Sequence, residues 1–564
     1  MSTNAHELNG DLPDITRPTH TVENQPPPLE GYNAYATDAA LRDALHREGG
    51  GWGEDRLQAF GEIAGGELVE VGRLANENPP KPRLFDRYGH RLDEVEFHPA
   101  YHRSMEIAKT HGLHGLTWTA ERDGAQVVRS ALTYIHNQFE SGTMCPITMT
   151  HACVPALRHQ PDVAEAWLPG ILANEYDPAC RPAGEKRGLT VGMGMTEKQG
   201  GSDVRSNSTR AYPLGRPGPG GEYELVGHKW FFSAPMCDAF LVLAYTDAGL
   251  SCFLLPKWRP DGTRNAIQVQ RLKDKLGDKS NASSEVEFRG AFGWMVGAEG
   301  RGVPTIIEMV AQTRLDCMLG SAGLMRHATA QAIHHCTYRE AFGRRLIEQP
   351  LMVNVLADLA LESEAALALS MRLARAFDGT ARGDEHDKRL ARIMTPIGKY
   401  WVCKRAPAQI NEAQECLGGA GYVEEHILPR LYRQAPLNSI WEGSGNVQCL
   451  DVLRAMGRDP DSVEALVAEL RSAKGENRHY DEHLARVQAA LSGDRSELEP
   501  SARRFTESIA LALQASILIR AGNAAVSDAF CASRLGGDAG LAFGTLPPGL
   551  DLTAIVERAD PHVN

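Results

Sequence analysis

Glu442 is the residue whose surroundings point most directly to chemistry. It lies in the stretch Asn438–Gln448 (N-S-I-W-E-G-S-G-N-V-Q), and the nearest formal charges in the sequence are Arg433 and Asp451. A carboxylate buried among apolar groups has a pKa raised toward neutrality, which suits a general base that removes a weakly acidic C–H proton. The alternative, from this stretch alone, is a solvated loop glutamate that precedes a helix.

Two motifs in the middle of the chain have residue types that bind flat or anionic ligands. Met193–Val204 (M-G-M-T-E-K-Q-G-G-S-D-V) combines hydroxyl groups with adjacent glycines, which let backbone N–H groups approach a ligand closely. The same letters are also ordinary turn sequence. His228–Ser233 (H-K-W-F-F-S) is strand-like, and alternation along a strand puts Trp230 and Phe232 on one face and Phe231 on the other. These rings either stack on a ring system or form part of a core.

Two further motifs follow long helical patterns. Arg339–Gly343 (R-E-A-F-G) places an arginine where it either caps helix carbonyls or holds a phosphate. Gly418–Tyr422 (G-G-A-G-Y) is a helix C-cap when taken alone, because it lacks the strand–turn–helix setting of a dinucleotide fingerprint. We expect no metal site, since there is no H-E-x-x-H motif and the adjacent His334 and His335 point in different directions on a helix.

Composition excludes several classes of protein. The net charge of −13 argues against indiscriminate binding to phosphate backbones or anionic membranes. The eleven cysteines show no C-x-x-C spacing, which favours reduced thiols and a cytoplasmic location. We expect no targeting segment and no membrane span, because the N-terminal residues are polar and the apolar run Ile509–Ile519 is short.

The hydrophobic pattern predicts an α+β fold in which helical regions flank a β region. One long helix is expected over Ala152–Leu168, and no strand comparable to the later ones appears before about residue 187. Four long helical segments suit an antiparallel bundle: Val303–Tyr338, Leu351–Phe377, Asp387–Leu417 and Val447–Met456. The expected order is a disordered tail (1–34), an N-terminal helical domain (35–186), a central antiparallel β-barrel or sandwich (187–298), a four-helix bundle (299–460) and an extra C-terminal helical domain (461–564).

Each motif has a structural alternative, but their order and separation are specific. T-E-x-x-x-G-S-D, K-x-aromatic-x-Ser, R-x-x-F-G, L-G-G-x-G-Y and x-E-G-S together resemble the acyl-CoA dehydrogenase superfamily from about residue 35 to 460. The fuller wording M-T-E-K-Q-G-G-S-D, K-W-F-F-S and K-D-K-L-G-D-K-S-N-A-S-S-E-V-E-F is similar to one branch, the AidB-type flavoproteins of the bacterial adaptive response to alkylating agents. These proteins also carry an extra C-terminal helical domain.

The resemblance implies that the chain binds FAD, and it assigns roles to individual residues. Glu442 falls at the position of the base that removes the α-proton of an acyl-CoA thioester. The arginine corresponding to Arg339 reaches the FAD pyrophosphate from a neighbouring subunit, and the family implies a homotetramer. The residues that the resemblance places around FAD are Met195, Thr196, Gly201, Ser202, Phe231, Phe232, Ser233, Arg339, Gly418, Gly419, Trp441, Ser444 and Asn446.

Two functions from different classes follow from the resemblance. The first is an acyl-CoA dehydrogenase, with electron-transfer flavoprotein as a partner; an acyl-CoA oxidase is a variant of it. The second is a protective flavoprotein that binds double-stranded DNA and turns over little or no substrate. Its DNA contacts would include Arg454, Arg471, Lys474 and Arg478, although residues 461–564 hold ten Lys and Arg against fifteen Asp and Glu.

The sequence departs from the usual family pattern at several positions. Lys198 and Gln199 stand where many members have Pro-Gly, Glu415 replaces a glutamine before L-G-G, and Pro350 replaces a glutamine after R-x-x-F-G. Trp441 is bulkier than the usual tyrosine beside the base. It is expected to narrow the acyl cavity and to make turnover weak.

Overall fold

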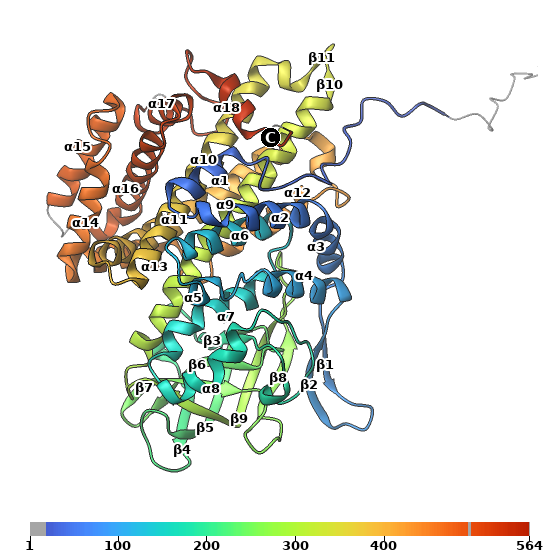
Figure 1. The fold of residues 1–564 in the computed structure, drawn as a ribbon, viewed down its shortest axis with the longest axis vertical. Coiled ribbons are helices and arrows are strands. Elements are labelled where there is room, and N and C mark those ends of the chain that lie inside the picture. Colours follow the sequence, from blue (N-terminus) through green and yellow to red (C-terminus); the bar gives the residue numbers. More distant parts are fainter. Residues whose placement is uncertain (1–18, 494–497, 538, 563–564) are drawn as a thin grey trace, which may run out of the picture.

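The computed structural model describes residues 19–493, 498–537 and 539–562 (Figure 1). Residues 1–18 of the expected tail lie outside the described residues. The part from residue 19 to 34 forms no helix or strand, yet it is attached to the rest of the chain. Asn24 donates a 2.8 Å hydrogen bond to the Glu340 carbonyl, His334 bonds the Pro27 carbonyl at 2.6 Å, and Leu29 is buried. The expectation of a disordered tail is therefore wrong for residues 19–34.

Eight helices build the N-terminal region. Asp38 caps the first helix by accepting a hydrogen bond from the Leu41 N–H. The single helix expected over residues 152–168 is instead two helices, because Pro161 has no N–H to continue the first and begins the second at its N1 position. The helices are α1 (Ala39–Arg47), α2 (Glu54–Gly65), α3 (Glu67–Glu77), α4 (Pro99–Thr110), α5 (Leu116–Thr119), α6 (Ala125–Phe139), α7 (Met144–Leu157) and α8 (Pro161–Leu172).

A β-hairpin interrupts these helices, which corrects the expectation of an all-helical N-terminal region. Strands β1 (Lys81–Phe85) and β2 (Arg91–Glu96) pair antiparallel, and they extend down beside β8 (Ile267–Leu272) of the central β region (Figure 1). Asp93 accepts a 2.9 Å hydrogen bond from the Val269 N–H of β8. Neither strand has a buried residue, so neither shows the apolar alternation by which a strand is predicted from sequence.

The central strands close into a barrel. Strands β5, β4, β6, β7 and β9 pair in that order, and β9 pairs back with β5, which decides between the barrel and the sandwich. Most pairs are antiparallel, but β3 and β4 both run parallel to β6. The strands are β3 (Val191–Gly194), β4 (Arg210–Pro213), β5 (Glu222–Ser233), β6 (Ala239–Thr246), β7 (Gly249–Pro256), β8 (Ile267–Leu272) and β9 (Ser283–Val296).

Long helices return after the barrel and form a bundle above it (Figure 1). The four expected helices correspond to α9 (Gly302–Tyr338), α10 (Pro350–Ala381), α11 (Glu385–Cys416) and α13 (Gly445–Arg458). A further helix, α12 (Leu428–Asn438), was not predicted, because its two prolines are unfavourable in a helical pattern. Short elements complete this region: β10 (Glu340–Ala341), β11 (Arg344–Arg345) and the 3₁₀ turns η4 (Leu346–Glu348) and η5 (Gly418–Gly421). Three further 3₁₀ turns lie earlier in the chain: η1 (Gly51–Gly53), η2 (Ala183–Glu185) and η3 (Val204–Ser206).

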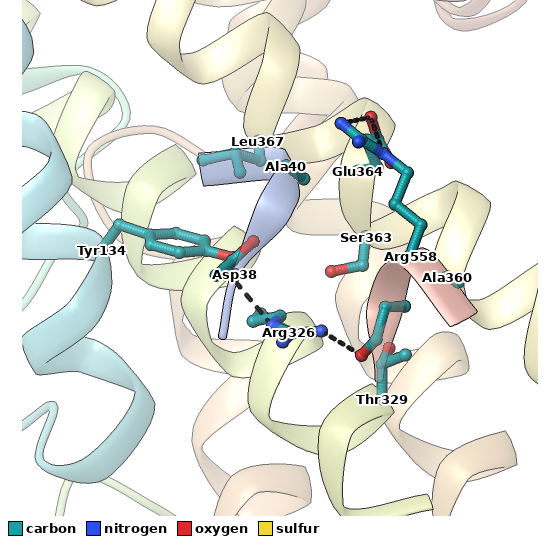
Figure 2. A pocket seen from close by; sticks show the side chains of 11 residues that line it. Asp38, Ala40, Tyr134, Arg326, Thr329, Ala360, Ser363, Glu364, Leu367 and Arg558 are labelled. Carbon is teal, nitrogen blue, oxygen red and sulfur yellow. Dashed lines mark hydrogen bonds and ion pairs between the residues drawn. The ribbon is translucent and has the colours of Figure 1, made fainter. Parts of the chain in front are cut away.

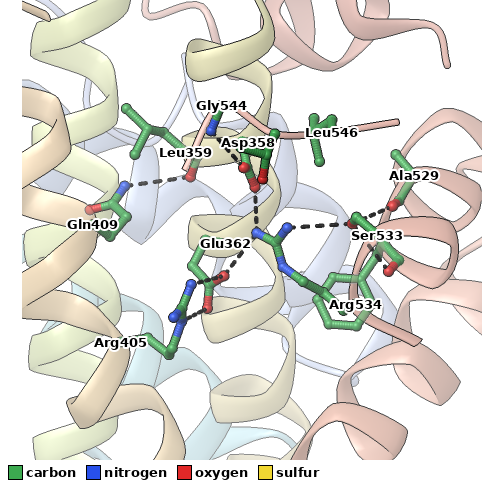
Figure 3. A network of polar contacts seen from close by, with 12 residues as sticks. Asp358, Leu359, Glu362, Arg405, Gln409, Ala529, Ser533, Arg534, Gly544 and Leu546 are labelled. Carbon is green, nitrogen blue, oxygen red and sulfur yellow. Dashed lines mark hydrogen bonds and ion pairs between the residues drawn. The ribbon is translucent and has the colours of Figure 1, made fainter. Parts of the chain in front are cut away.

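The C-terminal helices pack against one side of the bundle (Figure 1). In the described residues they are α14 (Pro460–Arg471), α15 (Arg478–Ser492), α16 (Leu498–Ala521), α17 (Ala524–Phe530), the π-helical turn η7 (Cys531–Leu535) and α18 (Leu552–Ala559). Figure 3 shows how η7 is attached: Arg534 pairs with Asp358 and with Glu362 of α10, the latter at 3.0 Å. Arg405 of α11 bonds the same Glu362 at 2.9 Å, so two guanidinium groups share two buried carboxylates.

Helix α18 closes a small cavity beside α9 and the start of α1 (Figure 2). Arg326 of α9 bonds the Ala559 carbonyl of α18 at 2.6 Å and pairs with Asp38 at 3.3 Å. The Tyr134 hydroxyl donates to the same Asp38 at 2.9 Å. The cavity of about 20 Å³ has room for about one water molecule, so it is a packing defect between helices rather than a ligand site.

Three general expectations concern the whole chain. All eleven cysteines are free, and ten of them are buried. Among the described residues, no group of histidine, cysteine and acidic side chains has the arrangement of a metal site. In the same part of the chain, none of the helices has the length and apolar character needed to cross a membrane.

Candidate active site

The loop between α12 and α13 holds Glu442 in a fixed, strained conformation. Glu442 has φ of +56°, in the left-handed region that residues other than glycine rarely adopt. Lys399 of α11 donates to the Trp441 carbonyl at 2.8 Å and to the Gly443 carbonyl at 2.6 Å. Gln448 of α13 donates to the Glu442 carbonyl at 2.9 Å. These bonds to the main chain keep the loop in place and leave the Glu442 carboxylate free to react.

The carboxylate of Glu442 faces α9. The Thr313 hydroxyl donates to it at 2.8 Å, and no cation of the described residues forms an ion pair with it. Burial raises the pKa of Glu442 above its ordinary value, opposed in part by the Thr313 hydrogen bond and by the charges of Arg314 and Lys399. A carboxylate whose pKa is raised by burial is the environment that the sequence predicted for Glu442, and its role as a base stays a prediction.

Arg314 is close to Glu442, but its charge is engaged elsewhere. Its Nη1 pairs with Asp451 at 2.7 Å, and its Nε donates to the Glu442 main-chain carbonyl at 3.2 Å. Arg392 pairs with the same Asp451 at 2.8 Å. Asp451 therefore neutralises the nearest guanidinium and prevents it from forming a direct ion pair with the base.

Trp441 connects the Glu442 loop, which joins α12 to α13, to the barrel. Its indole N–H donates to Asn438 at 3.1 Å, and Asn438 in turn donates to Ser321 of α9 at 3.1 Å. The indole packs against the apolar cluster of the barrel, and so does Met195 from the loop after β3. The Glu442 loop, through Trp441, and the loop predicted to bind the flavin, through Met195, thus border the same apolar cluster.

The loop after β3 lies beside the end of β5. Met193 pairs with Ser233, and the Trp230 N–H donates to the Thr196 carbonyl at 2.9 Å. The side-chain hydroxyls of Thr196, Ser202 and Ser233 have no hydrogen-bond partner among the described residues. A side chain at Gly201 would meet the Thr196 hydroxyl at 2.3 Å, so this tight turn requires a glycine. Three free hydroxyls beside a tight glycine turn suit a polar, planar ligand.

The aromatic strand presents a different face from the one that simple alternation predicts. The pairing of β5 with β9 shifts between Lys229 and Phe232, so both of these side chains point inward while Trp230 and Phe231 lie outside. Phe232 is 0% exposed and packs on Phe240 with ring centroids 4.4 Å apart. Phe231 is 49% exposed. Phe231 can contact a ligand outside the barrel, and Phe232 is a core residue.

Sequence comparison identifies the class of protein to which this geometry belongs. The chain is 48% identical to the Escherichia coli protein AidB over 516 residues, which cover 91% of this chain and 94% of that protein. This chain belongs to the acyl-CoA dehydrogenase family, in its AidB-type branch. Three family models match it in order: the adaptive response protein AidB N-terminal domain over residues 24–178, the acyl-CoA dehydrogenase middle domain over 192–291 and the acyl-CoA dehydrogenase C-terminal domain over 300–457.

Solved structures of acyl-CoA dehydrogenases have the same fold. An acyl-CoA dehydrogenase of Caenorhabditis elegans in complex with C11-CoA aligns with a TM-score of 0.80 and 27% identity, over 92% of each chain. An acyl-CoA dehydrogenase of Bacillus anthracis complexed with FAD aligns with a TM-score of 0.60 and 18% identity, over 78% of each chain. The second likeness shows the fold alone.

Other residues predicted from the family pattern lie away from the barrel loop, and some already have partners. Arg339 bonds the Asn24 carbonyl of the N-terminal segment. Asn446 accepts a 2.8 Å hydrogen bond from Arg503 of α16. Gly418, Gly419 and Ser444 are exposed. Within one chain these residues do not complete a single site, so their assignment to FAD stays a prediction.

The sequence interpretation missed the residues that hold the Glu442 loop. Thr313, Arg314, Lys399 and Gln448 come from three helices, and their contacts exist only in the folded chain. A signal was present nonetheless. Residues 312–316 (Q-T-R-L-D) are a polar run in the middle of a long apolar helix, and Lys399 is a lone cation in a buried stretch. Buried polar residues of this kind need partners, which makes them candidates for a site.

Proposed function

We propose that this protein is an FAD-dependent acyl-CoA dehydrogenase in which Glu442 removes the α-proton of an acyl thioester. Bound FAD would supply the acceptor for the β-hydride. The observation that supports the proposal is the Glu442 carboxylate, which is half-buried, has no ion pair among the described residues and has a pKa raised by its partial burial. A base with these properties accepts a proton from a weak carbon acid near neutral pH.

The residues that would hold FAD fit a flavin on chemical grounds. The free hydroxyls of Thr196, Ser202 and Ser233 can donate to the polar edge of the ring, and Phe231 offers an exposed aromatic face beside them. Met195 and Trp441 would close the apolar side. This assignment leaves Phe232 out of the contact set.

We propose an acyl-CoA as the substrate, because the Caenorhabditis elegans relative binds C11-CoA. The indole of Trp441 beside the base would reduce the room for the acyl chain, so we propose slow turnover. Electrons would leave through electron-transfer flavoprotein in a dehydrogenase, whereas rapid peroxide formation would identify an oxidase. We also propose a homotetramer in which Arg339 serves the FAD of a neighbouring subunit, and a cytoplasmic location consistent with the free cysteines.

The test is bleaching of bound flavin by a panel of acyl-CoAs of different chain lengths under anaerobic conditions. Glu442→Gln should abolish bleaching while FAD stays bound, because the amide cannot accept the α-proton. Glu425→Gln is a matched control, since Glu425 is exposed in the segment before α12 and has no ion pair among the described residues. If no chain length bleaches the wild-type flavin, the dehydrogenase proposal is wrong.

A DNA-binding role is a second candidate, supported by one surface feature. Arg471, Lys474 and Arg478 are all exposed around the turn between α14 and α15, and Arg478 has only a 3.8 Å ion pair with Glu482. Arg454 is exposed on α13 and contacts Asp451 at 3.3 Å. Phosphate contacts give an affinity that falls steeply with salt, so a gel shift across salt concentrations tests this role. Absence of binding at low salt would reject it.

A further inference from the structure

A cavity of about 390 Å³ lies where three separate parts of the chain meet, at the end of α1, the last third of α10 and the end of α16. None of its lining residues belongs to the Glu442 loop or to the proposed flavin contacts. The residues that line it are Arg47, Glu48, Arg372, Arg375, Ile517 and Arg520. Four arginines around one cavity are a high local concentration in a chain whose net charge is −13.

Two buried guanidinium nitrogens at this cavity have no hydrogen-bond partner within residues 19–493, 498–537 and 539–562. Arg372 is only 8% exposed; its Nε and Nη2 donate to Glu469 at 3.0 and 2.9 Å, but its Nη1 has no acceptor among the described residues. Arg47 donates from Nε to Glu48 at 2.9 Å, and its buried Nη2 also lacks an acceptor in that part of the chain. A buried N–H without an acceptor is unfavourable, so two of them at one cavity indicate a missing acceptor.

The surrounding charges favour an anion. Glu48 and Glu469 already accept hydrogen bonds from arginines of the cavity, and Asp387 lies 3.7 Å from Arg372. Arg520 also pairs with Glu469. Arg375 is exposed and has no ion pair among the described residues, so the four guanidinium groups outnumber the three neighbouring carboxylates.

We propose that this cavity binds a phosphate-class oxyanion, with Arg47 and Arg372 donating their unpaired N–H groups and Arg375 adding a third guanidinium. The planar, forked donors of arginine match the oxygens of phosphate. The volume admits inorganic phosphate or the phosphate of a small monoester. Because the donors come from α1 and α10 and the wall includes α16, the bound anion would also hold the C-terminal helices against the N-terminal region.

Isothermal titration calorimetry of the full-length holoprotein with inorganic phosphate measures the affinity of the site. Titration with sodium chloride at equal ionic strength is the blank. Arg47→Ala and Arg375→Ala should each weaken phosphate binding by about tenfold or more, the effect of removing one charged donor. Arg216→Ala is the matched control, since Arg216 is an exposed arginine in the β4–β5 turn. The affinity of this variant for phosphate should equal that of the wild type. Circular dichroism and FAD content confirm that each variant is folded.

The choice of probe identifies the source of the phosphate. If glycerol 3-phosphate binds more tightly than inorganic phosphate, the ligand is a monoester; equal or weaker binding identifies the free ion. The proposal is overturned if the wild type shows no saturable phosphate binding below about 10 mM. It is equally overturned if Arg375→Ala, which changes an exposed side chain, and Arg47→Ala both bind phosphate as the wild type does. Binding of a short DNA duplex that is lost in these variants but is not displaced by phosphate would replace a small-anion site with a nucleic-acid contact.

Discussion

The Thr313 hydroxyl donates to the Glu442 carboxylate at 2.8 Å, although the two residues lie 129 positions apart in the sequence. A hydrogen bond to the charged form of a carboxylate lowers its pKa, and here it opposes the effect of burial. Thr313 thus sets how basic Glu442 is, in addition to fixing its orientation. This relationship gives a direct prediction for the pH dependence of flavin reduction.

Replacement of Thr313 by valine should raise the pKa of Glu442 further, because burial would then act without the opposing hydrogen bond. As the proposed base, Glu442 must be deprotonated to act, so the rate of acyl-CoA-dependent bleaching should rise as pH increases through its pKa. The rising limb of that profile should move to higher pH in Thr313→Val. Thr313→Ser keeps the hydroxyl and should return the limb to the wild-type position. The same limb in all three proteins would show that the hydroxyl does not tune the base.

Asp451→Asn should have the opposite effect on the base. Asp451 is buried between Arg314 and Arg392, which hold the pKa of its carboxyl below the ordinary value against the effect of burial. Without this charge, Arg314 acts more strongly on Glu442 and lowers its pKa, so the rising limb moves to lower pH. Loss of a buried partner should also destabilise the protein by about 3–5 kcal/mol.

Arg454→Gln is the control for this prediction. Arg454 is the third and most exposed partner of Asp451, at 3.3 Å, and contributes little because water screens it. Its variant should keep both the pH profile and the midpoint of urea unfolding. A lower midpoint without any shift of the pH limb in Asp451→Asn would limit Asp451 to a structural role.

Phe231 and Phe232 are neighbours in sequence and should respond in opposite ways to truncation. Phe232→Ala removes a fully buried ring from the barrel and should destabilise the apoprotein by about 3–5 kcal/mol. Phe231→Ala changes an exposed ring, so it should alter stability by less than about 1 kcal/mol and instead lower FAD occupancy. Urea unfolding of the apoproteins and flavin absorbance of the purified proteins separate the two effects. Equal FAD loss in both variants, with equal stability, would contradict the assignment of faces.

This pair of residues also shows where prediction from sequence ends. The H-K-W-F-F-S run identified a strand and an aromatic contact, but the shift in register between Lys229 and Phe232 reversed which rings share a face. A bulge depends on the partner strand β9, which lies about 55 residues away, so alternation within one strand cannot reveal it. The strands β1 and β2 were not predicted for a related reason: neither has a buried face, so their sequences show no apolar alternation.

Prediction from sequence succeeded where a pattern is contained in one continuous segment of the chain. Helices α9, α10 and α11 each carry an apolar pattern over at least 32 residues, so their existence follows from periodicity. Glu442 could be selected because the family motif surrounds it in one short stretch. Thr313 and Lys399 could not be joined to it, because their contacts arise from helices that pack together only in the folded chain.

Lys109 gives a test of the fold that does not depend on catalysis. Burial lowers the pKa of Lys109 to about 7, and its ammonium donates to the carbonyls of Ile171 and Leu189, each at 3.1 Å. Between about pH 7 and its ordinary value of 10.5, the unfolded chain binds more protons at this residue than the folded chain. Its contribution therefore makes stability rise with pH in this window, with a slope of up to about 1.4 kcal/mol per pH unit, and leaves stability constant below it. Lys109→Met should flatten the rise seen in urea unfolding between pH 7 and 10, whereas Lys81→Met, at an exposed position of β1, should keep it. An unchanged slope in Lys109→Met would mean that Lys109 stays charged in the folded protein throughout this range.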